Sequence, residues 1–218
     1  MPRKAPVVLV IWKDFAFNKR GFSYRHTLEN KNLVEIICDG AMLEGLPRPL
    51  DKFPKLRKLH FTCCELSGDL LPLCKLRNLT SLTLASCFLS HLPREFSQLQ
   101  KLEKLDIGDN ICIHHICWSL SKLKSLKYLS LDECGLNMQE KEKTYKSPHL
   151  ERLGELVSLE YLNLSGNIFL KELPLQLKDC TKLKCVYLHE TSKECIASAQ
   201  AILSPEQINI KEVKEMSF

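Results

Sequence analysis

Leucines and polar residues follow a pattern that recurs along most of the chain. In residues 79–93, leucines occupy positions 79, 82, 84, 89 and 92, and Pro93 follows the last of them. The pair Leu82 and Leu84 has the two-residue period of a strand that buries one face. The later spacing is neither helical nor alternating. Because such a segment cannot bury its leucines alone, the pattern predicts one unit of a repeat.

Copies of this unit occur before and after it. They begin at Leu33, Leu56, Leu79, Leu102, Leu126, Leu159 and Leu183, in steps of 23, 23, 23, 24, 33 and 24 residues. Each copy contains a strand pair, of which Ile36/Cys38 is the first and Val186/Leu188 the last. Three residues after each pair lie Ala41, Cys64, Cys87, Asn110, Cys134, Asn167 and Thr191.

The copies resemble the leucine-rich repeat, L-x-x-L-x-L-x-x-[N/C]-x-L, over about residues 33–190. The Leu-Pro endings at Pro47, Pro93 and Pro174 resemble the intracellular type, which has repeats of about 23 residues. The resemblance implies an α/β-type solenoid, a curved right-handed array. A parallel β-sheet lines its concave side, and short helical or irregular segments form its convex side. It also implies that the Asn or Cys side chain turns inward and hydrogen-bonds the backbone of adjacent turns.

This pattern divides the chain into three parts. Residues 1–32 form an N-terminal cap, 33–190 hold seven repeats with an insertion at about 138–147, and 191–218 form a C-terminal cap and tail. The run from Val7 to Trp12 has strand composition. Lys193–Leu203 has helical spacing, and a short strand follows at Ile208 and Ile210. The charged segment 139–147 predicts a surface loop.

The chain has 11 cysteines, an odd number. No apolar run has the length of a signal peptide core or a membrane span, which predicts a cytoplasmic or nuclear location without disulfides. The repeat pattern itself places Cys38 on an inward strand position and Cys112 in the slot equivalent to Leu89.

Catalytic and metal-binding readings are disfavoured. Cys112, His114, His115 and Cys117 lie within six residues, but tetrahedral zinc sites usually take paired ligands from separated segments. A second set, Cys180, Cys185, His189 and Cys195, straddles the inward Leu183. Phosphate-binding loops and hydrolase motifs are missing from the sequence. We therefore expect no enzyme activity and no cofactor.

The outward strand residues predict a binding surface for another protein on the concave face of repeats four to seven. Tyrosine is enriched at interface hot spots, and the carboxylates around these tyrosines predict a basic segment in the partner. The candidate residues are Tyr128, Tyr161, Tyr187, Asp106, Asp109, Asp132, Glu133, Asn163, His189 and Glu190.

A rival surface is a ridge of lysines and arginines beside the strand starts, which comprises Lys55, Arg57, Lys75, Arg77, Lys101, Lys122, Lys124, Lys127, Lys182 and Lys184. It would suit an acidic protein, RNA or anionic lipid, although the net charge of +5 does not demand nucleic acid. We expect a non-catalytic adaptor in intracellular signalling. The alternative is a substrate-recognition subunit of a ubiquitin ligase or the recognition part of an innate immune sensor. The oligomeric state is left open.

Overall fold

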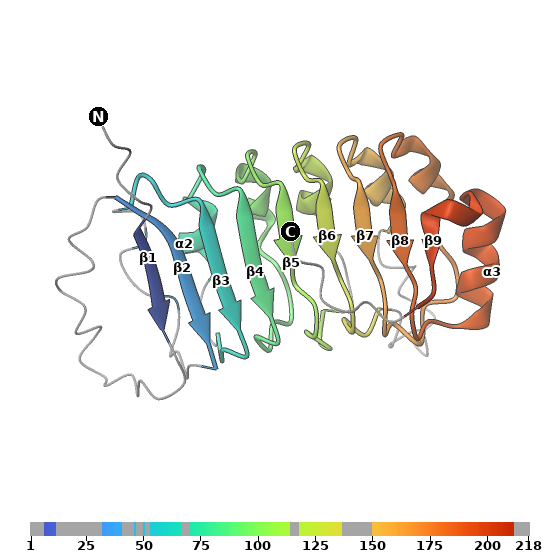
Figure 1. Ribbon diagram of the computed structural model, residues 1–218, viewed down its shortest axis with the longest axis horizontal. Helices are drawn as coiled ribbons and strands as arrows, with labels where there is room; N and C mark the ends of the chain where they lie inside the picture. The colour runs from blue at the N-terminus through green and yellow to red at the C-terminus, as the bar shows by residue number, and fades with distance from the viewer. Residues whose placement is uncertain are drawn as a thin grey trace.

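The strands form one sheet in which all neighbours are parallel and follow chain order (Figure 1). The computed structural model describes residues 7–11 (backbone), 32–40, 46, 50, 53–66, 70–113, 118–136 and 150–211. The nine strands of this part are β1 (Val7–Ile11), β2 (Leu33–Asp39), β3 (Lys58–Thr62), β4 (Ser81–Ala85), β5 (Lys104–Asp106), β6 (Tyr128–Ser130), β7 (Tyr161–Asn163), β8 (Cys185–Tyr187) and β9 (Ile208–Asn209).

The strands stack in register with the sequence repeat. Leu59 pairs with Leu82, and Leu82 pairs with Leu105, so equivalent residues of successive repeats form columns across the sheet. Both members of each predicted strand pair are buried, from Ile36 and Cys38 to Val186 and Leu188. Side chains at every second position of a strand point to one face, so this burial leaves the intervening residues on the other, concave face. The predicted solenoid is confirmed.

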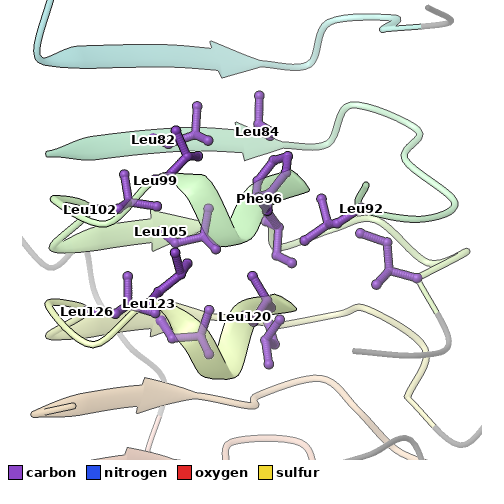
Figure 2. Packing of buried hydrophobic residues seen from close by; sticks show 14 of the residues in the cluster. Leu82, Leu84, Leu92, Phe96, Leu99, Leu102, Leu105, Leu120, Leu123 and Leu126 are labelled. Carbon is purple, nitrogen blue, oxygen red and sulfur yellow. The ribbon is translucent and has the colours of Figure 1, made fainter. Parts of the chain in front are cut away.

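Short helices lie behind the sheet and close the core (Figure 1). They are the α-helix α2 (Leu71–Cys74) and the 3-10 helices η2 (Arg94–Gln98), η3 (Trp118–Lys122), η4 (Leu150–Glu155) and η5 (Leu175–Asp179). Figure 2 shows Phe96 and Leu120 of these turns beside the strand leucines, with Leu99 and Leu123 completing the layer. Truncating a buried strand leucine such as Leu105 should cost about 2–5 kcal/mol, because each repeat buries its leucines only against its neighbours.

The Asn/Cys position forms an inward ladder, as predicted. The Asn110 amide nitrogen donates to the carbonyls of Leu84, Ile107 and Gly108 at 2.8–3.0 Å. Cys87 and Cys134 replace this amide with thiols that donate to strand carbonyls at 3.4 and 3.3 Å. Burial raises the pKa of both thiols to about 12. They therefore remain protonated donors at neutral pH.

The placement of Cys112 in the inward slot is wrong. Cys112 is exposed, and Ile113 is buried in its place. After Cys87 the next buried apolar residue comes two positions later, at Leu89, whereas after Asn110 it comes three positions later. The physical reason is a turn in which the Ile113 N–H donates to the Asn110 carbonyl at 2.8 Å. The same turn in repeat six makes Leu170 rather than Phe169 the buried residue.

The two ends of the sheet carry the remaining elements. β1 pairs with β2 at one edge, so the predicted strand near the N-terminus is present. At the other end lie α3 (Lys193–Ile202), the 3-10 helix η6 (Pro205–Gln207) and β9. Ser192 begins α3 by accepting the Cys195 N–H at 3.0 Å, and Cys195 and Ala199 are its buried residues. Residues 12–31, the predicted insertion at 138–147, and residues 212–218 lie outside the described part. The division into caps and repeats stays a prediction.

Candidate functional site

Parallel pairing aligns the predicted concave residues in rows. Tyr128 of β6 lies beside Tyr161 of β7, and Tyr161 lies beside Cys185 of β8. In the next column, Asp106 pairs with Ser130, and Asn163 pairs with Tyr187. These residues are the outward members of strands whose alternate leucines are buried, so the hydrophobic period alone places them on one face.

Most of the predicted residues surround one hollow of about 530 Å³ on this face. We call it the acidic groove. Its lining includes eight of the candidates, namely Asp106, Asp109, Tyr128, Asp132, Glu133, Asn163, His189 and Glu190, together with Ala85, Ser86, Lys104, Gly108, Ser130 and Ser165. Tyr161 and Tyr187 are not among the lining residues. The carboxylates therefore lie together around the groove, whereas Tyr161 and Tyr187 lie outside its lining.

Two glycines make room for the carboxylates of repeat five. A Cβ atom built on Gly108 would lie 2.3 Å from Asp132 Oδ1, so the Asp132 side chain lies against the backbone of repeat four. A Cβ atom on Gly166 would lie 2.4 Å from Glu133 Cγ, which places Glu133 against repeat six. The acidic side chains of repeat five thus extend to both sides along the groove.

Hydrogen bonds fix several of the groove side chains. Ser86 Oγ donates to Asp109 Oδ2 at 2.6 Å, and the Gly108 N–H donates to Asp106 Oδ1 at 3.1 Å. Ser130 Oγ donates to Asp132 Oδ1. Each contact orders a carboxylate that retains further acceptor positions, since one carboxylate offers about four lone-pair sites. The groove is therefore built to accept hydrogen bonds from donors outside the chain.

Burial and neighbouring carboxylates raise the pKa of two groove residues, Asp106 and Glu133. Burial, and then the nearby Asp132 charge, raise the pKa of Asp106 above its ordinary 3.8, although the Gly108 N–H opposes this. Burial and the charges of Asp109, Asp132 and Glu190 raise the pKa of Glu133 above 4.5. Like charges held together destabilise one another, and a bound cation would relieve that repulsion. The repulsion between these carboxylates therefore favours a positively charged ligand.

The aromatic residues beside the groove already have neighbours in the chain. Lys104 Nζ lies 5.1 Å from the ring centroid of Tyr128, and Lys184 Nζ lies 5.6 Å from that of Tyr161. Burial raises the pKa of Tyr128 and of Tyr187 to about 12. Both phenols therefore stay neutral at physiological pH and can donate a hydrogen bond.

The prediction missed three groove residues with a clear role. Gly108 leaves space for the Asp132 side chain, and Lys104 places a positive charge over the ring of Tyr128. Ser165 contributes a hydroxyl to the groove lining. Among the residues that the structure describes, Ser165 Oγ is the buried side-chain oxygen without a hydrogen-bond partner. An unpaired buried hydroxyl is unfavourable, so a ligand group that reaches it would gain affinity. The column position of Ser165 was visible in the sequence, but its lack of a partner was not.

Part of the rival lysine ridge is paired within the chain. Lys122 and Lys124 lie 3.2 and 3.7 Å from Glu155, Lys127 lies 2.8 Å from Glu103, and Lys184 lies 2.6 Å from Glu160. Lys55 and Lys101 donate to Asn32 and Asn78 at 2.7 and 2.9 Å. The lysine–glutamate pairs join consecutive repeats and offset part of the positive charge of the ridge, which weakens the case for an acidic ligand there.

Neither predicted cysteine–histidine set gathers as a metal centre in the described part. Within those residues, no three Cys, His, Asp or Glu side chains converge in a way that could hold a metal ion. His114, His115 and Cys117 of the first set lie outside the described residues. Of the second set, Cys180 and Cys195 are buried in the core, which separates them from the groove residue His189.

Comparison with protein families decides what kind of repeat this is. Family profiles described as Leucine rich repeat match residues 77–136 and 158–180. The chain is a leucine-rich repeat protein. Proteins built from this repeat are generally non-catalytic scaffolds for protein–protein recognition. No curated protein matches the sequence.

Solved leucine-rich repeat structures share the fold at low sequence identity. An internalin (InlF) of Listeria monocytogenes is 21% identical with a TM-score of 0.62, over 83% of this chain and 48% of the internalin. A Leptospira interrogans LRR protein is 22% identical with a TM-score of 0.61, over 84% and 50%. A chain of the Drosophila Toll–Spätzle complex is 20% identical with a TM-score of 0.67, over 86% and 24%. This leucine-rich repeat protein thus spans half or less of these three chains.

The helices of the described part are short or polar compared with a membrane span. In the described part of this leucine-rich repeat protein, no helix combines the length and the apolar composition that crossing a bilayer requires. The cytoplasmic or nuclear location stays a prediction.

Proposed function

We propose that this leucine-rich repeat protein is a non-catalytic adaptor in intracellular signalling, and that its acidic groove binds a basic segment of another protein. The observation that carries the proposal is the convergence of Asp106, Asp109, Asp132, Glu133 and Glu190 on one hollow. These residues come from repeats four, five and seven, so only a ligand that spans several repeats contacts all of them. Arg or Lys side chains suit the site, because they supply several hydrogen-bond donors with a positive charge.

The three predicted tyrosines differ in their position relative to the acidic groove. Tyr128 lines the acidic groove, whereas Tyr161 and Tyr187 flank it from neighbouring rows of the same face. We assign Tyr128 to the contact with the basic segment and the other two to the edge of the interface. The ubiquitin-ligase and immune-sensor alternatives stay predictions that only the identity of the partner can separate.

The test compares partners captured by three forms of the whole chain. The groove variant D109N/D132N/E133Q removes three charges while keeping side-chain shape. The matched control E172Q/D179N/E194Q removes three charges from exposed positions outside the groove. Affinity purification with mass spectrometry identifies the partners, and calorimetry with the purified candidate gives the affinity.

We expect a partner that binds the wild-type chain and the control equally and the groove variant at least about tenfold more weakly, since removing one member of a charge pair that becomes buried on binding leaves the other member unpaired. Binding that is equal in all three forms would exclude the acidic groove as the partner site.

A further inference from the structure

A row of exposed apolar side chains borders the acidic groove. Phe88 is 81% exposed, Ile111 is 61% exposed and Ile168 is 60% exposed. Each follows the inward Asn/Cys position of its repeat, directly after Cys87, Asn110 and Asn167. We call Phe88, Ile111, Ile168 and the adjoining Phe169 the apolar strip. These residues follow the ends of β4, β5 and β7, and repeat five, which lies between Ile111 and Ile168, has Gly135 at this position.

The backbone at Phe88 is held in an unfavourable conformation. Its φ is 55°, in the left-handed region that a bulky residue rarely adopts. The equivalent residue of repeat five is Gly135, with φ 63°, which adopts this conformation at no steric cost. A large aromatic side chain that is both strained and exposed gains nothing for folding. Strain of this kind is typical of functional positions.

The apolar strip and the acidic groove are close along the chain in repeats three and four. Ser86 and Asp109 of the groove precede Phe88 and Ile111 by two residues, a separation of at most about 7 Å along the chain. Ser86 and Asp109 are also hydrogen-bonded to each other across the two repeats. In repeats three and four, exposed apolar residues therefore lie close to residues of the acidic groove. A ligand that covers both must have an apolar side and a positively charged side.

We propose that the apolar strip docks the apolar face of an amphipathic basic helix in the partner, while the positive face of that helix reaches the acidic groove. This inference rests on the function proposed above and adds the chemistry of the bound segment. Adjacent parallel strands lie about 4.8 Å apart, and an α-helix rises about 5.4 Å per turn. One helical turn therefore matches one repeat, whereas every second residue of an extended strand repeats at about 6.6 Å.

Two synthetic peptides test the proposal with the whole chain. Both are helices of three to four turns rich in lysine. One carries leucine at the apolar face of each turn, and the other carries alanine at the same positions, which preserves helix formation. Fluorescence anisotropy measures their affinities for the wild-type chain, for F88S/I111S and for a control, V157S/L175S, which removes two exposed apolar residues outside the strip.

The leucine peptide should bind the wild-type chain and the control about tenfold more tightly than the alanine peptide does, and F88S/I111S should abolish that difference. A difference that persists in F88S/I111S, or one that is missing in the wild-type chain, would overturn the proposal. So would sedimentation data showing that F88S/I111S dissociates a wild-type dimer, because the strip would then serve self-association.

The same titration separates this inference from the function on which it rests. The variant D109N/E133Q should weaken binding of both peptides. If it changes neither affinity, the basic-segment function fails, whatever the peptides show about the strip. Suppose that D109N/E133Q weakens binding of both peptides, but the leucine and alanine peptides bind the wild-type chain with equal affinity. The acidic groove then remains the binding site, and the apolar strip is excluded as a docking site for a helix.

Discussion

The side chain of Asp132 occupies the space that a side chain on Gly108 would need. The two residues belong to successive repeats, and a Cβ atom at position 108 would lie 2.3 Å from Asp132 Oδ1. The absence of a side chain in repeat four thus determines where the carboxylate of repeat five lies. This relationship makes the shape of the acidic groove testable by a single methyl group.

We expect Gly108→Ala to weaken binding of a basic partner about tenfold, because the methyl group displaces the Asp132 carboxylate. The atoms it meets are the end of one side chain, so the free energy of unfolding should change by less than about 1 kcal/mol. Calorimetry and urea unfolding measure the two effects. In the Asp132→Ala background, G108A should have no further effect on binding, and an additive loss would contradict this explanation.

The pKa of Asp106 predicts a pH dependence of stability. Its pKa is raised in the folded state, mainly by burial, so its contribution to stability is fully present below its ordinary value of 3.8. That contribution is lost as the pH rises through the folded-state pKa. Asp106→Asn should therefore be more stable than the wild type at pH 7, and the difference should shrink as the pH falls towards 4. Urea unfolding at a series of pH values measures it. A variant that is less stable at pH 7 would contradict the prediction.

The Asn/Cys ladder predicts unequal losses at equivalent positions. Asn110→Ala removes three donated hydrogen bonds and two accepted ones, from the N–H groups of Cys87 and Leu89. The buried backbone groups lose their partners, so we expect a loss of about 3 kcal/mol or more. Cys87→Ala removes only weak thiol bonds and should cost about 1 kcal/mol. Equal losses in chemical denaturation would show that the thiol and the amide serve the ladder equally.

Replacing Phe88 by glycine should stabilise the fold. Glycine adopts the left-handed conformation at this position without strain, and the exposed ring contributes little burial. We expect Phe88→Gly to raise the free energy of unfolding by about 0.5–1 kcal/mol. Phe88→Ala retains the strain and should leave stability unchanged. Thermal unfolding of both variants measures the effect, and a destabilised F88G would indicate that the ring packs on the rim.

The sequence pattern does not predict where the backbone of one repeat differs from that of the others. Cys112 fits the inward slot by counting, but a turn at Asn110 adds one residue and buries Ile113 instead. The same turn exposes Phe169 and so extends the apolar strip. Counting cannot detect the turn, because it depends on how the backbone closes after the inward amide.

The leucine pattern alone predicts the solenoid and the columns of its concave face. A leucine period of 23 or 24 residues fixes parallel strands in register, and the two-residue period within each strand fixes which side chains point outward. This period predicts that Asp106, Asp132 and Tyr128 lie on one face, and all three line the acidic groove. Which of these side chains contact each other follows from the packing of one repeat on the next. Asp132 lies against Gly108, lysines pair with glutamates of neighbouring repeats, and the hydroxyl of Ser165 has no partner. All three features depend on the directions of side chains between repeats, and no period in the sequence encodes those directions.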